Sequence, residues 1–369
     1  MMDYFKRFHS NTLAGSGSQF FFRNEDETNI TRGCCFYKIF EGGEYPYSFL
    51  FSNTIDSTYS SGAKSHKNLI VDSWVIEEML VGVTAFCDKN SFERPADMKP
   101  VLFSGKGRRV VNPGELFCSD DIILNGKCGE YICLEIAFSG GMIPYHDESI
   151  IPTFVLEDGE WVPSKKHPFP SMIGSEIGAK KKIAFLGDSI TQGIGTPVNS
   201  YAHWNAVLAE GLGREYSYWN LGLGFGRADD AASDGVWLYK AKQNDFVFVC
   251  YGVNDILQGY DAETIKKNLQ IIVDKLTDAG VRVVIQTVPP FNYSDTHRAI
   301  WNDVNNFIKN DIKNVTMVFD CVPCLSVGDE KLHIAKYGGH PDEEGCRVWG
   351  EALLEAVVSS GVLNGGINE

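Results

Sequence analysis

The stretch KIAFLGDSIT, residues 182–191, decides the fold of the C-terminal half of this 369-residue chain. Its first five residues form a largely apolar run with the length of a buried strand, which Gly187 and Asp188 end. A serine between a strand and a helix presents its hydroxyl to the crevice at the end of a sheet, where backbone amides can support a nucleophile or an anion. Ser189 holds that position, although a Gly-Asp-Ser triplet alone is also compatible with an ordinary polar turn.

Strands and helices alternate from this stretch to the end of the chain. The run at 245–251 is almost entirely apolar, which is typical of a parallel strand buried on both faces. Asp261 is placed to cap a helix, and Pro341 stands where a last helix is expected to begin. Further strands are predicted at 216–221, 281–288 and 315–320, and further helices at 201–212, 229–242 and 296–312. Five successive strand–helix units predict an α/β fold, a flavodoxin-like doubly wound parallel five-stranded sheet over residues 181–369.

The first 165 residues have a different pattern. Short strand-like runs recur between Gly-Gly, Asn-Pro-Gly and Asn-Gly turns, which predicts an all-β, jelly-roll-like sandwich domain over residues 1–165. Residues 161–180 are rich in Pro, Ser, Gly and Lys, so we expect a linker at 166–180 between the two domains.

Charge and cysteine content limit the possible partners. The net charge of −15 disfavours nucleic acid and anionic membranes, because both need a density of Lys and Arg that is absent here. No apolar run has the length of a membrane span, and the N-terminus lacks the apolar segment of a secretory signal. The ten cysteines lie at irregular positions, which is typical of free thiols in a reducing compartment. We therefore predict a cytoplasmic protein.

One cysteine pair has the CxxC spacing that redox and metal sites use. Cys321 and Cys324 stand alone, however, with no second pair nearby, and we interpret them as two ordinary thiols at a strand end. No cluster of His and carboxylates has the spacing of metal ligands. We expect neither a metal nor another cofactor.

Chemically useful residues follow the predicted strands of the C-terminal half. Residues 220–226, with the sequence NLGLGFG, form a glycine-rich turn that can direct backbone N–H groups to one point. Asn254 follows the next strand, and His340 precedes the last helix. Because ligands bind at the carboxyl ends of parallel strands, we expect these groups to meet Ser189 there. Acyl transfer needs this combination, since the attacking hydroxyl must lose a proton and the oxyanion must be stabilised.

Four segments together resemble the motifs of the SGNH, or GDSL-type, hydrolase superfamily. They are FLGDSIT at 185–191, NLGLG at 220–224, YGVND at 251–255 and GGHPDEEG at 338–345. The resemblance implies a serine esterase in which Ser189 is the nucleophile and His340 is the general base. It also implies an oxyanion hole made by the N–H of Ser189, one amide of the glycine turn and the side chain of Asn254.

The glycine turn departs from the family pattern at one position. Counted strictly, the last glycine of the family falls on Phe225, and a small shift would put Gly224 or Gly226 there. A backbone donor needs no particular side chain, so the turn can still serve. We assign the donor to Gly224.

The second departure concerns the residue that orients the histidine. Most relatives have Asp three residues before it, where this chain has Tyr337. Three interpretations are open: a Ser–His dyad steadied by a backbone carbonyl, a carboxylate such as Asp329 or Glu330, and an inactive relative. We favour the dyad, because an acid that only orients an imidazole can be replaced by another acceptor. His333 is a rival to His340 as the base, but no Pro-led helix follows it.

Other polar residues near these motifs have simpler interpretations. Asp188 and Asp255 are expected to accept hydrogen bonds from backbone amides and so to hold the turns. Asp188 and Tyr337 are also candidates for residues that support the catalytic site. Arg227 is open between a substrate contact and a surface salt bridge. His203 and Trp204 are interpreted as helix-face residues.

The N-terminal half is similar to the β-sandwich that precedes the catalytic domain in some two-domain GDSL esterases. The similarity rests on FLFSNT at 49–54, VLFSG at 101–105 and SDDI at 119–122. This layout implies a carbohydrate O-acetyl esterase or a related short-chain esterase, with a small-molecule or oligosaccharide ester as substrate. The alternatives are a thioesterase or lysophospholipase of the same superfamily, and a non-catalytic carbohydrate-binding relative. A homo-oligomer is compatible with the sequence, which does not determine the oligomeric state.

Overall fold

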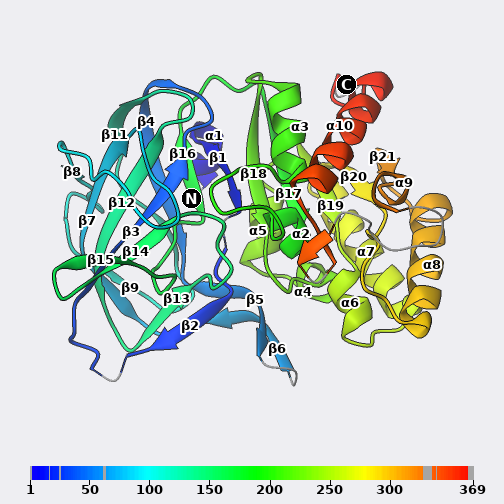
Figure 1. Ribbon diagram of the computed structural model, residues 1–369, viewed down its shortest axis with the longest axis horizontal. Helices are drawn as coiled ribbons and strands as arrows, with labels where there is room; N and C mark the ends of the chain where they lie inside the picture. Colours follow the sequence, from blue (N-terminus) through cyan, green and yellow to red (C-terminus); the bar gives the residue numbers. More distant parts are fainter. Residues whose placement is uncertain are drawn as a thin grey trace. The chain divides into compact units, whose positions relative to one another are not determined.

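The computed structural model describes residues 2–15, 17–24, 26–60, 64–326, 335–337 and 339–364. The chain forms two compact units, whose strands and helices are drawn in Figure 1. The first contains Met1–Lys180 and Ser217–Trp219, and the second contains Lys181–Tyr216 and Asn220–Glu369. Strand β18 (Tyr216–Gly222) therefore contributes residues to both units.

Antiparallel strands make up most of the first unit. β12 (Tyr131–Ser139) pairs with β3 (Thr31–Lys38) on one side and with β7 (Trp74–Thr84) on the other. A second group of antiparallel strands forms around β4 (Gly43–Ser52). The remaining elements are α1 (Met2–Arg7), β1 (His9–Gly15), β2 (Phe20–Arg23), β5 (Thr54–Ser60), β6 (Lys64–Ile70), β8 (Lys99–Pro100), β9 (Arg109–Val111), β10 (Leu116–Cys118), β11 (Ile122–Gly126), β13 (Met142–Tyr145), β14 (Thr153–Glu157), β15 (Glu160–Pro163) and β16 (Met172–Ser175). The N-terminal half is thus β-rich, as predicted, and its jelly-roll-like order remains a prediction.

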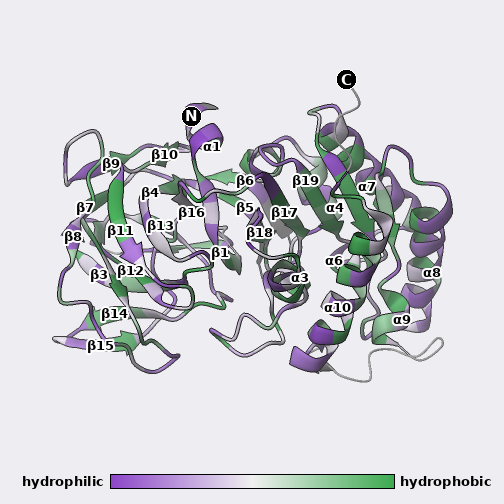
Figure 2. Ribbon diagram, turned by 90° about the horizontal axis from the view of Figure 1, so that it is seen from above, coloured by the Kyte–Doolittle hydropathy of each residue, from purple (hydrophilic) through white to green (hydrophobic). Residues whose placement is uncertain are grey.

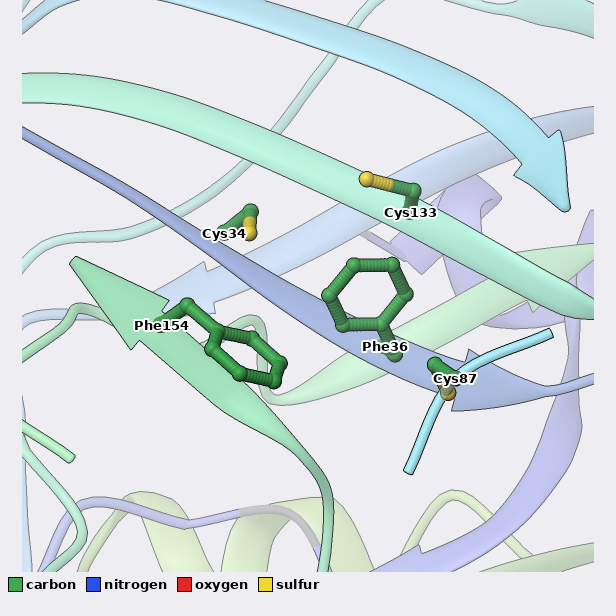
Figure 3. Packing of buried hydrophobic residues seen from close by; sticks show 5 residues of the cluster. All are labelled: Cys34, Phe36, Cys87, Cys133 and Phe154. Atoms are coloured by element: carbon green, nitrogen blue, oxygen red, sulfur yellow. The ribbon is translucent and has the colours of Figure 1, made fainter. Parts of the chain in front are cut away.

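Strand alternation places a sulfur-rich apolar cluster in this unit. Cys34 and Phe36 are two residues apart on β3, so their side chains lie on the same face of the sheet. Phe154 is the cross-strand partner of Cys34, and Cys133 is the partner of Phe36. Figure 3 shows these side chains gathered together with Cys87. Buried thiols of this kind act as small apolar side chains.

The predicted linker contains ordered structure. Its residues 172–175 form β16, which pairs antiparallel with β4 and with β1. All four residues of β16 are buried. The Pro- and Ser-rich composition of 166–180 predicted a linker and not a strand. Whether a short segment forms a strand depends more on its pairing and packing partners than on its composition.

The second unit is built on parallel strands. β17 (Lys181–Gly187), β19 (Phe246–Cys250), β20 (Arg282–Gln286) and β21 (Met317–Phe319) are neighbours in that order. β19 has a paired strand on each side, and all five of its residues are buried, as is typical of a parallel strand whose two faces are both covered. The parallel α/β class agrees with the prediction, and the five-stranded flavodoxin-like arrangement remains a prediction.

The longer helices of this unit are amphipathic. α7 (Ala262–Thr277) begins after Asp261, whose carboxylate accepts a hydrogen bond from the Thr264 N–H at 2.7 Å, which confirms the predicted cap. α8 (Asp295–Asn310) carries both hydrophobic and hydrophilic residues along its length (Figure 2). The other helices are α2 (Ser189–Gln192), α3 (Trp204–Leu212), α4 (Ala228–Ala232), α5 (Val236–Ala241), α6 (Val253–Leu257), α9 (Val322–Leu325) and α10 (Glu343–Ser360).

Two helix predictions were wrong in detail. The single helix predicted at 229–242 is divided into α4 and α5, because Ser233 and Gly235 adopt extended conformations between them. The last helix begins at Glu343 rather than Pro341. Asp342 is its cap, accepting a hydrogen bond from the Gly345 N–H at 3.0 Å.

Candidate active site

Ser189 lies at the junction that the sequence predicts. β17 ends at Gly187 and α2 begins at Ser189. The Asp188 carboxylate caps this short helix by accepting a hydrogen bond from the Ile190 N–H at 3.0 Å. Glycine is required at position 187, because a Cβ there would clash with Thr191 Oγ1. The tight turn leaves Ser189 largely buried, with 8% of its surface exposed.

The imidazole of His340 contacts this hydroxyl directly. Ser189 Oγ and His340 Nε2 lie 2.8 Å apart, although 151 positions separate the two residues in the sequence. This distance suits a serine that passes its proton to a base as it attacks. His340 lies in β23 (His340–Pro341), which pairs with β22 (Ala335–Tyr337), and Tyr337 is its cross-strand partner.

Packing supports the imidazole on two further sides. The ring of Phe291 meets it edge-to-face, with ring centroids 5.3 Å apart and planes at 79°. Gly195, in the loop after α2, packs behind it: a Cβ there would lie 3.0 Å from the His340 Cβ and would clash with the Pro341 carbonyl oxygen. Sequence analysis missed both contacts. The only local signal was the Gly-Ile-Gly at 193–195.

Backbone hydrogen bonds hold the glycine turn after β18. Leu223 N–H donates to the Gly187 carbonyl, and Gly226 N–H donates to the Leu223 carbonyl, each at 3.0 Å. Within the described part of the chain, the N–H groups of Gly224 and Ser189 have no acceptor. The assignment of Gly224 as an oxyanion donor therefore agrees with the hydrogen bonding and remains a prediction.

The backbone of this turn is closely fitted to α2. Phe225 adopts φ 60°, a left-handed conformation that is uncommon for a bulky residue. A Cβ at Gly222 would clash with the Gln192 backbone nitrogen, so only glycine allows this approach. The Asn220 side chain accepts a hydrogen bond from the Gly222 N–H at 2.8 Å and donates to the Thr191 carbonyl at 3.1 Å. Asn220 thus connects the turn to the helix that begins at the nucleophile, a role that the sequence did not predict.

Asn254 lies in α6, beside the same turn. Its Nδ2 donates to the Gly226 carbonyl at 2.9 Å. A side-chain amide has two N–H donors, so this bond leaves one for a ligand. Contacts between four distant segments therefore connect Ser189, His340, the glycine turn and Asn254.

Residues 185–348 match the GDSL-like Lipase/Acylhydrolase family. This segment is a GDSL-like lipase/acylhydrolase domain. The match confirms the resemblance to SGNH hydrolases that the four motifs indicate.

Individual relatives are more distant. The chain is 26% identical over 131 residues to an arylesterase of Vibrio mimicus, covering 34% of this chain and 64% of the arylesterase. It therefore spans less than two thirds of that relative's length. Among solved structures, a member of the lipolytic protein G-D-S-L family from Veillonella parvula is 21% identical, with a TM-score of 0.39, and covers 48% of this chain and 98% of its own. A carbohydrate acetylesterase from Sinorhizobium meliloti is 19% identical, with a TM-score of 0.38, and covers 49% of this chain and 100% of its own.

Two buried carboxylates flank the site of the GDSL-like domain. Asp188 caps α2, and Asp255 accepts hydrogen bonds from the Ala228 and Asp229 N–H groups at 2.9 and 3.4 Å. Burial, with a smaller contribution from the nearby Asp255, raises the pKa of Asp188 to about 7, although hydrogen bonds from backbone N–H groups act in the opposite direction. Burial likewise raises the pKa of Asp255 to about 7, while its bonds to backbone N–H groups lower it. Both side chains hold turns next to the predicted catalytic residues.

Arg227 makes a salt bridge, but not at the surface. The residue is 4% exposed, and its guanidinium pairs with the buried carboxylate of Asp230. The other side of the guanidinium faces Gln258 and Tyr260. The sequence could not predict this burial, because it depends on where residues 255–260 lie.

The residue that orients His340 remains a prediction. Tyr337 contributes its backbone to the β22–β23 pair. Asp329, Glu330 and His333 lie outside the described residues. The dyad interpretation therefore stands as stated from the sequence.

Two further candidates are interior residues. His203 is 0% exposed, and burial lowers its pKa to about 3, so the imidazole is neutral. Trp204 stacks on Trp349, with ring centroids 5.0 Å apart. Their positions agree with a packing role in the GDSL-like domain.

The CxxC cysteines have unreactive surroundings. Cys321 Sγ donates to the Thr287 carbonyl at 3.2 Å, and burial raises the pKa of both Cys321 and Cys324. The thiolate is the reactive form, so a raised pKa agrees with ordinary thiols. Among the described residues, no three His, Cys, Asp or Glu side chains are grouped so that they could hold a metal ion. The helices in that part of the chain include none that is long and apolar enough to cross a membrane.

Proposed function

We propose that this protein is a serine esterase that hydrolyses short-chain acyl esters, foremost acetyl esters of a carbohydrate. One observation carries the proposal: Ser189 Oγ lies 2.8 Å from His340 Nε2, beside two backbone N–H groups that have no acceptor among the described residues. Membership of the domain in the GDSL-like lipase/acylhydrolase family supports an ester as the substrate class.

The proposed reaction has two stages. His340 Nε2 accepts the Ser189 proton as Oγ attacks the ester carbonyl carbon, and the oxyanion is stabilised by the N–H groups of Ser189 and Gly224 and by the Asn254 amide. The imidazolium then protonates the leaving alcohol as the C–O bond breaks. Water attacks the acyl-serine while His340 accepts its proton. Collapse of the second intermediate releases the carboxylic acid and returns the proton to Ser189.

Active-site labelling tests the proposal most directly. We expect a fluorophosphonate probe to modify the folded protein at Ser189, as mapped by mass spectrometry of the labelled peptide. Heat-denatured protein is the control for nonspecific labelling. A folded protein that stays unlabelled, or that is labelled at another serine, would contradict the assignment and favour a non-catalytic carbohydrate-binding role.

The acyl and alcohol parts of the substrate need separate tests. The preference for acetyl groups on carbohydrates follows from the resemblance to two-domain sugar deacetylases. The relationship to an arylesterase supports p-nitrophenyl esters as practical substrates. We expect kcat/KM to fall from p-nitrophenyl acetate to the octanoate and acetate to be released from acetylated oligosaccharides. The reverse trend with chain length would favour a lysophospholipase or thioesterase.

The proposal includes the cellular setting. The cysteine pattern supports a cytoplasmic location, and the negative charge favours a small-molecule or oligosaccharide ester over nucleic acid or membrane as partner. A homo-oligomer is compatible with it, and light scattering after size exclusion measures the oligomeric state.

A further inference from the structure

Side-chain hydrogen bonds connect the two segments that carry the predicted oxyanion donors. One segment runs from the glycine turn, residues 220–226, into α4, and the other runs from α6 to residue 260. Gly224 belongs to the first segment and Asn254 to the second. The relative position of these two donors therefore depends on the bonds between the segments.

Asp255 makes the most buried of these connections. It is 0% exposed and follows Asn254 directly in α6. Its Oδ2 accepts a hydrogen bond from the Ala228 N–H at 2.9 Å, and its Oδ1 accepts one from the Asp229 N–H at 3.4 Å. One carboxylate thus holds the backbone that leads out of the glycine turn.

Arg227 makes a second connection between the same segments. Its Nε donates to Asp230 Oδ2 at 2.8 Å, and its Nη2 donates to Asp230 Oδ1. Its Nη1 donates to Gln258 Oε1 and to the Tyr260 hydroxyl, each at 3.3 Å. The Tyr260 hydroxyl in turn donates to Asp229 Oδ2 at 3.4 Å.

Asn254 itself supplies the third connection, through its bond to the Gly226 carbonyl at 2.9 Å. All three connections lie within a few residues of both donors. Oxyanion stabilisation depends on donors fixed in advance at the right positions, and a misplacement of about 1 Å can cost on the order of 100-fold in rate. Burying a carboxylate and an ion pair also costs desolvation free energy, which packing alone does not require.

We propose that Asp255 is a positioning residue of the oxyanion hole, supported by the Arg227–Asp230 pair. It sets the spacing between the Gly224 N–H and the Asn254 amide by fixing the glycine turn against α6. It touches neither substrate nor reacting atoms. This inference rests on the proposed esterase function.

The main test is Asp255→Asn, measured on the full chain with p-nitrophenyl acetate. Asparagine keeps the size of the side chain, but its NH2 cannot accept the second backbone hydrogen bond. We expect kcat to fall on the order of 10- to 100-fold with KM changed by less than about twofold, as for loss of stabilisation in the transition state alone. Affinity for phenylboronic acid, whose adduct with Ser189 places an anionic oxygen in the oxyanion hole, should fall by a similar factor.

Asp120→Asn is the matched control. In the first unit, Asp120 also accepts two successive backbone N–H bonds, from Ser104 at 2.8 Å and from Gly105 at 2.7 Å. A structural role alone would give both variants the same signature, a lower melting temperature with unchanged kcat. We expect the loss of kcat and of boronate affinity in Asp255→Asn only.

Two further variants keep the inference testable if Asp255→Asn does not fold. Tyr260→Phe removes the hydroxyl between Arg227 and Asp229 and should lower kcat by about two- to tenfold, the net value of a hydrogen bond. In an Asn254→Ala background, Asp255→Asn should cost less than in the wild type, because one donor that it positions is already absent. Unchanged kcat in folded Asp255→Asn or Tyr260→Phe, or fully additive losses in the double variant, would overturn the inference. Wild-type protein without esterase activity would instead overturn the proposed function.

Discussion

Glu135 in the first unit and Asp255 in the second are buried carboxylates with different hydrogen-bond partners. Glu135 in β12 is 3% exposed and accepts hydrogen bonds from Arg32 and Arg94, each at 2.8 Å. Asp255 in the second unit is 0% exposed and is bonded to backbone N–H groups at the start of α4. Asp188, next to Ser189, repeats this second arrangement.

The difference indicates what each carboxylate does. Two guanidinium groups cancel the charge of Glu135, so it can remain inside a packed sheet as a structural feature. Backbone dipoles offset the lost hydration of Asp188 and Asp255 only in part, and burial therefore raises the pKa of both carboxyl groups to about 7. Glu135 therefore serves the packing of its sheet. Asp188 and Asp255 instead hold the segments that carry the predicted catalytic groups.

The largest effect is expected for replacement of the nucleophile, which should abolish activity and leave stability almost unchanged. Ser189→Ala should lower kcat for p-nitrophenyl acetate by at least about 10³-fold, since it removes the nucleophile. Its melting temperature should stay within a few degrees of the wild type, because only one hydroxyl is lost. Steady-state kinetics and thermal melting measure the two effects. A variant that retains wild-type turnover would show that another residue attacks the ester.

The pH dependence of stability sharpens the comparison of the carboxylates. The folded-state pKa of Asp188 is about 7, above the unfolded value of about 3.9, so the folded protein binds a proton that the unfolded chain has released. The free energy of unfolding from this group should therefore fall as pH rises from about 4 to 7, by an amount on the order of a few kcal/mol.

Urea melts at pH 4.5, 6 and 8 test this expectation. Asp188→Asn should lose stability less steeply over that interval than the wild type, because asparagine does not titrate. An identical slope in the two proteins would mean that Asp188 is ionised throughout and that backbone N–H bonds neutralise it fully.

Loss of an oxyanion donor should come next. Asn254→Ala should lower kcat on the order of 10²- to 10³-fold, as is typical when one such donor is removed. Labelling of Ser189 by a fluorophosphonate should slow but persist, because nucleophile and base remain. A decrease in kcat of less than fivefold would show that the Asn254 amide does not stabilise the oxyanion.

Stability of the first unit should depend on Glu135. Glu135→Gln removes the charge that Arg32 and Arg94 share and should destabilise the protein by about 2 kcal/mol, the value of a hydrogen bond to a charged group. Glu78→Gln is the matched control, since Glu78 pairs with the same Arg32 but its side chain is 50% exposed. That variant should lose less than about 1 kcal/mol. Equal losses would remove the distinction between the buried and the exposed partner.

The smallest expected effect concerns packing around the base. Gly195→Ala should displace His340, because the new Cβ would clash with the Pro341 carbonyl, and kcat should fall about tenfold. Gly280→Ala is the control: Gly280 also has a positive φ, 81°, but apart from its chain neighbours no described residue has an atom within 4 Å of the position a Cβ would take. It should change stability without changing kcat. The same kcat in both variants would show that the loop after α2 does not position the imidazole.

The local patterns that sequence analysis interpreted correctly share a physical property. The apolar runs that became β17 and β19 are buried along most or all of their length, so their composition follows from their environment. The cap at Asp261 is a bond between neighbouring residues and needs no tertiary information. The strand β16 was missed because its pairing with β4 joins segments far apart in the chain. The break between α4 and α5 was also missed, and there Lys275 Nζ, from α7, donates to the Ala232 carbonyl at 2.9 Å.

By itself, the sequence determined which groups can do the chemistry: a serine after a strand, a glycine-rich turn, an asparagine and a histidine before the last helix. These follow from residue type and from the alternation of strands and helices, which are local properties. Only the tertiary structure decided that Ser189 Oγ lies 2.8 Å from His340 Nε2 and that Phe291 and Gly195 pack against His340. It also decided that Asp255 joins α6 to the start of α4, just after the glycine turn. Each of these contacts joins segments far apart in the chain, and distances between such segments are set by how the strands and helices pack, not by the order of the residues.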